Sequence, residues 1–269
     1  MKSQRLFDTH THSLNSPDGF DSVDEMCRSA IEKGLSVITI TDHYEIPDRH
    51  IPKYKAAIYE GYQDILKAKE KYKDKIEVLA GIELGGAKYC VEHSKEVLRL
   101  NHYDFVLNSL HGIPGQTDYH DRNYEGYDYN PMLIDYYTEL LEQCKLDLFD
   151  SLAHLDYPTR YIRLQGIAYD ESHYTEYTDK ILTYLAQNGK ALEINTSGLF
   201  SPFKQTLPSF NAVKRFRELG GEFITIGSDS HEKELVARGF DEAVDMAYQA
   251  GFKYVTYFKD RKPVCVNII

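Results

Sequence analysis

Short apolar segments alternate with longer amphipathic segments along most of this 269-residue chain. The short segments are rich in β-branched residues and almost continuously apolar, which is typical of strands buried on both faces of a parallel sheet. Seven such segments are present: Leu6–His12, Ser36–His43, Glu77–Leu84, Asp104–His111, Leu148–His154, Ala191–Thr196 and Phe223–His231. We therefore predict seven parallel strands.

Segments with helical periodicity fill the intervals between these strands. The first begins with a capping-box pattern formed by Ser22 and Glu25 and ends at Gly34. The other expected helices are Lys53–Tyr72, Glu92–Asn101, Pro131–Gln143, Tyr174–Asn188, Ser209–Leu219 and Glu234–Ala250. Repeated strand–helix units with right-handed crossovers predict a closed or nearly closed parallel barrel. Two further apolar runs, Tyr254–Phe258 and Pro263–Ile269, would complete one domain that spans residues 1–269.

Two connections are long enough to suggest functional loops. The segment Ile113–Asn130 is rich in Tyr and Gly, and the segment Asp156–Tyr169 contains two arginines. The Tyr-rich segment either covers part of a substrate or packs its rings at the base of a loop or at a subunit contact.

Composition excludes several classes of protein. The formal net charge is −11, with 31 basic and 42 acidic residues, so the chain lacks the basic character of nucleic-acid-binding proteins. It has no apolar run long enough to span a membrane, and its start, Met1–Arg5, has no apolar leader segment. The four cysteines form no C-x-x-C pair, which predicts no disulfide framework and no cysteine-based zinc site. We expect a cytoplasmic protein without nucleic-acid or membrane partners.

Polar side chains gather at the C-terminal ends of the expected strands. A parallel barrel brings all these ends to one rim, where enzymes of this architecture have their active sites. Residues at i and i+2 share a face of a strand, so His10 and His12 point the same way, as do Asp229 and His231. The set comprises His10, His12, His43, Glu83, His111, His154, Asp229 and His231.

Imidazole and carboxylate groups are ligands for zinc, iron and manganese. One histidine at a strand end is more often a structural residue, but so many strand ends with ligand side chains are hard to explain by chance. The set exceeds what one tetrahedral ion needs, so we expect two or three metal ions. The five other histidines are expected to be solvated: His50, His93, His102, His120 and His173.

The ordered motifs resemble those of the polymerase-and-histidinol-phosphatase (PHP) superfamily. These motifs are His10-x-His12, Asp42-His43, Glu83, His111, His154 and Asp229-x-His231. Within the superfamily, the segments 227–231, 192–198 and 153–156, with Arg160 and Tyr161, are most similar to the histidinol-phosphate phosphatases. The resemblance covers nearly the whole chain. It implies a distorted (β/α)7 barrel, in agreement with the seven strands predicted above.

The resemblance also implies a site for three divalent ions, which would be zinc, manganese or iron. It assigns the first ion to His10, His12, Glu83 and Asp229. It assigns the second ion to Glu83, His111 and His154, with Glu83 bridging, and the third ion to His43 and His231. Many relatives supply a further histidine to the third ion, but the stretch Ser13–Gly19 has none. Asp18 is the expected substitute.

The activity implied is hydrolysis of L-histidinol phosphate to L-histidinol and phosphate in histidine biosynthesis. Two neighbouring metal ions lower the pKa of a shared water, and we expect the bridging hydroxide to attack phosphorus. Glu83 and Asp229 would be catalytic, the latter as both ligand and proton acceptor. Asp42 could orient the His43 ring, although strand alternation places it on the opposite face.

Four residues are candidates for contact with the substrate. Phosphate binding favours a planar guanidinium, for which Arg160 is the first candidate and Arg163 the second. Asn195 and Ser197 share a face at the sixth strand end, where they either contact substrate or form a simple turn.

Three alternatives remain open. Some relatives act on nucleic acid, so the chain could be a PHP-type nuclease or phosphodiesterase, although its charge argues against this. It could also hydrolyse a different small phosphate ester, or it could be a metal-holding structural module without activity. The surplus of ligands and the long rim loops favour chemistry. The sequence does not indicate an oligomeric state.

Overall fold

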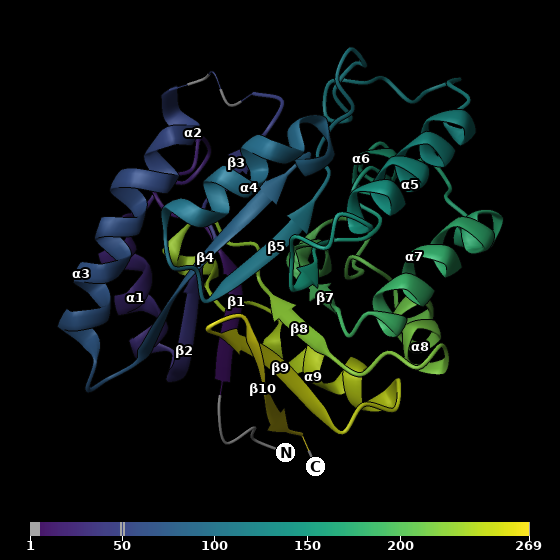
Figure 1. The fold of residues 1–269 in the computed structure, drawn as a ribbon. Coiled ribbons are helices and arrows are strands. Elements are labelled where there is room, and N and C mark those ends of the chain that lie inside the picture. The colour runs from purple at the N-terminus through teal and green to yellow at the C-terminus, as the bar shows by residue number, and fades with distance from the viewer. Residues whose placement is uncertain (1–5, 49, 51, 269) are drawn as a thin grey trace.

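Seven parallel strands follow one another around a barrel in the computed structural model, which describes residues 6–48, 50 and 52–268 (Figure 1). In spatial order they are β1 (Leu6–Thr11), β2 (Leu35–Ile40), β4 (Glu77–Gly85), β5 (Phe105–Ser109), β6 (Ser151–Leu152), β7 (Ala191–Asn195) and β8 (Ile224–Gly227). The chain beyond β8 returns to β1 at the rim, where the amide of His12 donates to the carbonyl of Ser230 over 2.8 Å. The nearly closed parallel barrel is thus confirmed.

One predicted strand is interrupted just before His43. The expected strand Ser36–His43 divides into β2 and a short strand β3 (His43–Glu45). Strand β2 pairs with the first half of β4 and β3 with the second half, with His43 opposite Glu83 and Glu45 opposite Gly85. The interruption therefore brings His43 alongside Glu83.

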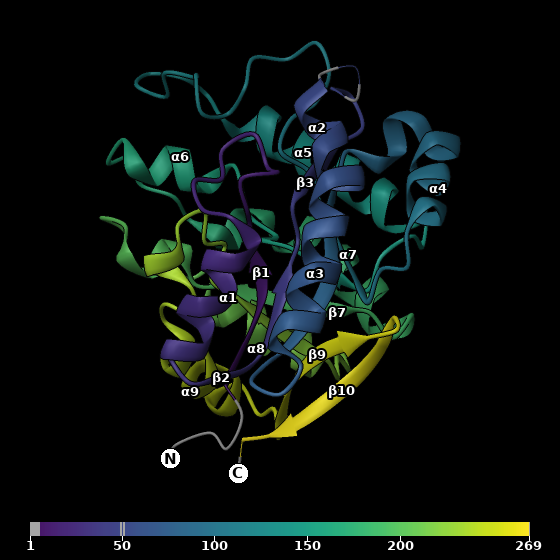
Figure 2. The ribbon, with the colours of Figure 1, turned by 90° about the vertical axis from the view of Figure 1, so that its left-hand side faces the viewer.

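Helices cover the outer surface of the barrel (Figure 2). They include α1 (Val23–Glu32), α4 (Val91–Leu100), α5 (Asn130–Cys144), α7 (Thr175–Gln187), α8 (Phe210–Glu218) and α9 (Phe240–Gln249). The predicted capping box of α1 is confirmed, because the Glu25 amide donates to Ser22 Oγ and the Ser22 amide donates to the Glu25 carboxylate. The expected helix Lys53–Tyr72 consists of α2 (Pro52–Ala56), a π-helical turn (Ala57–Gly61) and α3 (Tyr62–Tyr72).

Two expectations about local structure are wrong. The helix predicted from Glu234 begins only at Phe240, because Gly239 has a φ of 79° and interrupts the helical backbone. The segment Asp156–Tyr169, expected to be a loop, contains the short helix α6 (Thr159–Leu164). Six residues are too few for helical periodicity to stand out in the sequence.

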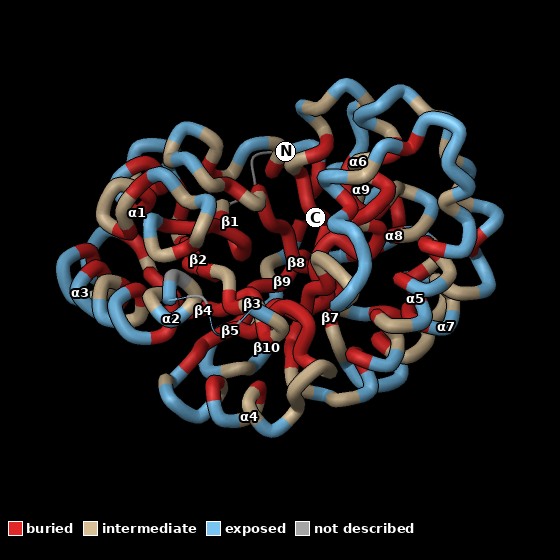
Figure 3. The backbone as a smooth tube through the Cα atoms, turned by 90° about the horizontal axis from the view of Figure 1, so that it is seen from above, coloured by how far each residue is buried: buried red, intermediate tan, exposed pale blue. Residues whose placement is uncertain are grey.

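A C-terminal hairpin fills the end of the barrel opposite the rim. Strands β9 (Tyr254–Lys259) and β10 (Lys262–Asn267) are antiparallel, close to the expected apolar runs. The Phe258 ring stacks on Phe105 of β5 with centroids 5.4 Å apart, and the Arg261 side chain pairs with Asp150. Buried strands occupy the centre, and exposed segments form the periphery (Figure 3). The rim is therefore the end available for a site.

The Tyr-rich segment Ile113–Asn130 carries no strand and only the first residue of α5. Tyr119 and Tyr124 are each 1% exposed and belong to the hydrophobic core, so for these rings the packing alternative holds.

All four cysteines are free, as predicted. Within the described ranges, we find no helix with the length and apolar character that a membrane crossing requires. The expectations for residues 1–5 and for Ile269 concern positions outside the described residues.

Candidate functional site

Glu83 lies at the centre of the site, fully buried on β4. Its two carboxylate oxygens face different groups of histidines. Oε2 lies 3.2 Å from His10 Nε2 and 2.8 Å from His43 Nδ1, whereas Oε1 lies 2.9 Å from His154 Nε2. One carboxylate can therefore contribute to more than one metal position.

The first ligand group combines β1, β4 and the turn after β8. His10 Nε2 and His12 Nε2 each lie within 3.5 Å of both Glu83 Oε2 and Asp229 Oδ1. All four side chains are buried. This is the set that the family resemblance assigns to the first ion, and the structure brings its donor atoms together.

The second ligand group surrounds the other oxygen of Glu83. His111 Nε2 lies 3.2 Å from Glu83 Oε1 and 3.2 Å from His154 Nε2. Both histidines follow the ends of their strands, β5 and β6, as the parallel topology requires. The three donors expected for the second ion thus face one another.

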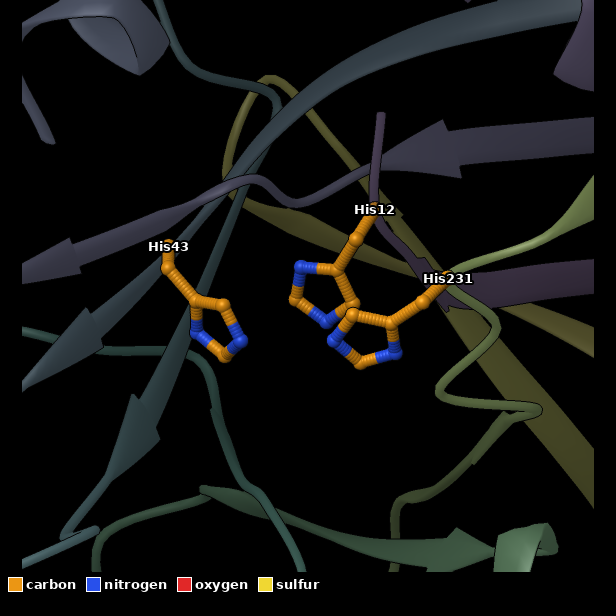
Figure 4. A group of neighbouring side chains, drawn as sticks. All are labelled: His12, His43 and His231. Atoms are coloured by element: carbon orange, nitrogen blue, oxygen red, sulfur yellow. The ribbon is translucent and has the colours of Figure 1, made fainter. Parts of the chain in front are cut away.

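The third ligand group contains the predicted substitute for a missing histidine. Asp18 Oδ2 lies 3.1 Å from His231 Nε2 and 3.6 Å from His43 Nε2. His12 lies between these two histidines, with its ring stacked 4.2 Å from His43 and 4.3 Å from His231 (Figure 4). Asp18 therefore occupies a position from which it could complete this group.

The donor atoms fit metal ions better than they fit one another. The buried nitrogens His12 Nε2, His43 Nδ1 and His231 Nε2 make no hydrogen bond of acceptable geometry, although each lies within 3.5 Å of a carboxylate oxygen. Three overlapping sets have donor atoms within 4.8 Å of one another: His12, His43 and His231; His10, His12 and Glu83; His43, Glu83 and His111. Converging nitrogens and oxygens of this kind are suited to divalent cations.

Electrostatics keeps the carboxylates of the centre ionised. Burial alone would raise the pKa of Glu83, but the charges of His43, His10 and His111 outweigh it and hold the pKa well below its usual value. Burial opposes the charge on His12 as well, and His43 and His231 add repulsion, so the His12 pKa is well below its usual value. A neutral imidazole beside ionised carboxylates is the state that binds metal ions.

Two of these residues have unusual backbone conformations. His154 has a φ of 24° and Asp229 a φ of 55°, which are uncommon values for residues with a side chain. Each residue lies two positions after the end of its strand, β6 or β8, and its side chain reaches Glu83 or His10. Such strain persists only where surrounding contacts hold it in place.

A cavity of about 680 Å³ opens beside the three groups. Arg160 of α6 lines it, donating to Asp229 Oδ2 over 3.2 Å and to Ser197 Oγ over 2.8 Å. The cavity wall also contains Tyr54, Tyr157 and Tyr161, but no tyrosine of the segment Ile113–Asn130. An otherwise acidic cavity thus presents a guanidinium directly beside the candidate metal ligands.

The structure does not bring Arg163 to this cavity. Its guanidinium donates to Asp156, Thr159 and Gln205 and lines a second, separate cavity. The expected contact of Arg163 with substrate phosphate is therefore not supported. The sequence ranked Arg160 above Arg163 but predicted a loop here, so it did not show that the two arginines line different cavities.

Asn195 and Ser197 form a local hydrogen-bonded turn that also reaches the centre. Asn195 Oδ1 accepts from the amide and the hydroxyl of Ser197, which is the turn alternative. The Asn195 amide donates to Asp229 Oδ2, and Ser197 accepts from Arg160. Both residues thus contact the candidate site residues through their side chains.

Several residues near the ligands were missed at the sequence level. Glu193 lies 2.6 Å from His10 Nδ1, and Glu45 lies 2.7 Å from His111 Nδ1. Strand alternation places Glu193 on the face of Asn195 and Glu45 on the face of His43, but it does not indicate which histidine each carboxylate contacts. Asp42 does not contact the His43 ring. It accepts instead from Ser13 and Ser16.

Comparison with known proteins identifies the family. The model of the PHP domain matches residues 8–197, and the remaining part of the chain includes β8 and Asp229. The chain belongs to the PHP-domain family.

Two proteins similar to this chain are named as histidinol-phosphatases. The chain is 30% identical over 256 residues to a probable histidinol-phosphatase of Clostridium acetobutylicum, covering 94% of this chain and 97% of that protein. It is 29% identical over 267 residues to the histidinol-phosphatase of Lactococcus lactis subsp. lactis, covering 96% of each.

A solved structure of this family has the same fold. It is the histidinol phosphate phosphatase of Lactococcus lactis subsp. lactis, complexed with zinc, L-histidinol and phosphate. The TM-score is 0.80 at 25% sequence identity, covering 97% of this chain and 99% of that chain.

Proposed function

We propose that this PHP-domain protein is a metal-dependent phosphomonoesterase that hydrolyses L-histidinol phosphate to L-histidinol and phosphate. The observation that carries the proposal is the convergence of three His and carboxylate groups on Glu83, beside Arg160 in one cavity. The names of the two relatives, and the zinc, L-histidinol and phosphate in the similar structure, support this substrate.

We infer three divalent ions, zinc, manganese or iron, held by the three groups described above. When bound, such ions lower the pKa of coordinated water and offset negative charge on phosphate oxygens. The ligands we assign are His10, His12, Asp18, His43, Glu83, His111, His154, Asp229 and His231.

The chain's own residues have distinct roles in this proposal. Arg160 binds phosphate oxygens with its planar guanidinium, and Ser197 and Asp229 hold that guanidinium in position. Glu83 contributes one carboxylate oxygen to the first ligand group and the other to the second, and so fixes the positions of these two groups relative to each other. Asp229 directs Oδ1 toward His12 and Oδ2 toward Arg160, and we assign it the role of proton acceptor beside the bound phosphate.

The cavity wall favours a substrate with a cationic leaving group. Asp48 and Asp118 line the cavity together with Tyr54. Carboxylates and tyrosine hydroxyls are suitable partners for the ammonium and imidazole groups of histidinol. The same acidic wall repels a nucleic-acid backbone, which disfavours the nuclease alternative.

We also propose a single domain and a cytoplasmic location. Strand β8, beyond the matched segment, completes the barrel and precedes Asp229, so the C-terminal part belongs to the same unit. Four free cysteines are consistent with a reducing compartment.

Phosphate release from L-histidinol phosphate tests the proposal. The purified protein, saturated in turn with zinc, manganese and iron(II), is assayed against L-histidinol phosphate, p-nitrophenyl phosphate and a single-stranded oligonucleotide. We expect the highest kcat/KM for histidinol phosphate and complete loss of activity with a chelator. Faster cleavage of the oligonucleotide, or no activity on any ester, would overturn the proposal.

A further inference from the structure

Glu193 is a buried carboxylate of β7 that belongs to none of the three ligand groups. It is 0% exposed, and its two oxygens have separate partners. Oε1 lies 2.6 Å from His10 Nδ1, while Oε2 accepts from the backbone amide of His154 over 2.9 Å. It therefore contacts one residue of the first ligand group and one of the second.

The contact with His10 sets the state of that imidazole. When the imidazole is neutral, as a metal ligand must be, an N–H donated from Nδ1 to Glu193 leaves Nε2 free of its proton, and His10 Nε2 is the nitrogen that faces Glu83 and Asp229. A carboxylate behind a metal-binding histidine fixes the tautomer and ring orientation and makes the histidine a stronger ligand.

The contact with His154 acts on the backbone. His154 has the strained φ of 24°, and its amide N–H donates to the Glu193 carboxylate. A charged acceptor with a fixed position holds this turn in the conformation that brings His154 Nε2 to 2.9 Å from Glu83.

A third contact extends from Glu193 toward Arg160. The Asn195 amide donates to Glu193 Oε2 and to Asp229 Oδ2, both over 3.2 Å. Asn195 also accepts from Ser197, which accepts in turn from Arg160. The metal-ligand side of the cavity and the Arg160 guanidinium are thus connected by a chain of hydrogen bonds, which is buried at Glu193 and partly buried toward Arg160.

The neighbouring strand leaves room for this arrangement only because it carries a glycine. A Cβ at Gly227 of β8 would overlap both Glu193 Oε1 and the His10 side chain. The close approach of Glu193 to His10 is therefore built into the pairing of β7 with β8.

We propose that Glu193 is a positioning residue that couples the first and second ligand groups, holding His10 and His154 in register around Glu83. This inference rests on the metal centre of the proposed function and does not depend on the identity of the substrate. It predicts that a single change at Glu193 weakens metal binding in two groups at once.

Glu45 provides a matched control within the same chain. It makes the same kind of contact, 2.7 Å from His111 Nδ1, but it touches only the second ligand group. If carboxylate–imidazole pairing were the whole effect, Glu193→Gln and Glu45→Gln would have equal consequences. If Glu193 couples the two groups, its variant affects one more binding step than the Glu45 variant does.

Stepwise Co²⁺ titration of the metal-free full-length protein, followed by visible absorption and by competition with a chelator, measures each binding step. For Glu193→Gln we expect two steps weakened by about 10- to 100-fold, and for Glu45→Gln one step. Thermal unfolding of the metal-free proteins is measured in parallel. A lower Tm for Glu193→Gln with unchanged Co²⁺ affinities would overturn the proposal, because that is the result of a purely structural role.

Glu193→Asp covers the case in which Glu193→Gln does not fold. The shorter carboxylate keeps the charge but cannot reach both partners, so we expect one weakened step, which full affinity at both steps would contradict. A wild-type protein that binds no Co²⁺ would overturn both the centre and the role of Glu193. A wild-type protein that binds Co²⁺ but does not hydrolyse histidinol phosphate would overturn only the proposed substrate.

Discussion

In this site, the two oxygens of one carboxylate contact different partners. Asp229 turns Oδ1 toward His10 and His12 and Oδ2 toward Arg160, so one carboxylate links the ligand groups to the guanidinium. Removing Arg160 should therefore weaken phosphate binding and leave the ligand groups in place. For Arg160→Ala we expect KM to rise about 10- to 100-fold, because a charge-assisted hydrogen bond is lost. Steady-state kinetics at saturating metal measures this change.

Arg163 is the matched control for that experiment. It lies three residues further along α6 but contacts Asp156, Thr159 and Gln205 instead of lining the candidate site. Arg163→Ala should leave KM within about twofold of wild type. An unchanged KM in Arg160→Ala, or equal increases in both variants, would remove Arg160 from the phosphate site.

Asp18 gives a second prediction at this scale, because its carboxylate faces two histidines of the third ligand group. Its carboxylate, more than half exposed, is 3.1 Å from His231 Nε2. Asp18→Asn keeps the size but removes the charge, so the ion held by the third ligand group should dissociate more readily. Asp18→His should retain that ion. The number of bound ions per chain is measured for both variants and the wild type after dialysis against a metal buffer. An equal number in Asp18→Asn and wild type would contradict the role of Asp18.

At the scale of elements, strand register decides which side chains support the ligands. Strand β3 places Glu45 opposite Gly85 of β4, and a Cβ at that glycine would overlap the Glu45 carboxylate. We expect Gly85→Ala to displace Glu45 from His111 and weaken one metal-binding step by about 10-fold, with little loss of fold stability, since the obstructing atoms belong to the end of a side chain.

A double-mutant cycle checks this explanation. If Gly85→Ala acts through Glu45, then combining it with Glu45→Gln should add almost nothing to the effect of either change alone. Additive losses of affinity would show that the alanine disturbs the centre by another route.

The elements also indicate how far the sequence could predict this site. Strand ends such as His10–His12 were predictable because alternation within one strand is local information. The support from Glu193 and Glu45 was not predicted, because it depends on which strands are neighbours and on a glycine in the partner strand. Helix α6 was missed for a different reason, since six residues give too little periodicity.

At the scale of the whole molecule, stability and metal binding should be coupled through pH. Burial lowers the pKa of His111, but Glu83 and Glu45 outweigh it and raise the pKa to about 9. The pKa of His111 is thus above the value of about 6.5 expected in the unfolded chain. In the metal-free protein, the stability contributed by this imidazolium is therefore complete below about pH 6.5 and is lost as the pH rises toward 9.

Metal binding should offset this dependence, because a neutral His111 is the form that binds an ion and at high pH no proton has to be displaced from it. We expect the free energy of unfolding of the metal-free protein to fall by about 3 kcal/mol between pH 6.5 and 9 through this one group. The stabilisation gained from metal should grow over the same range. Urea unfolding at several pH values, with a chelator and with saturating metal, measures both. A metal-dependent stabilisation that stays constant or shrinks as the pH rises would show that His111 carries no proton in competition with the ion.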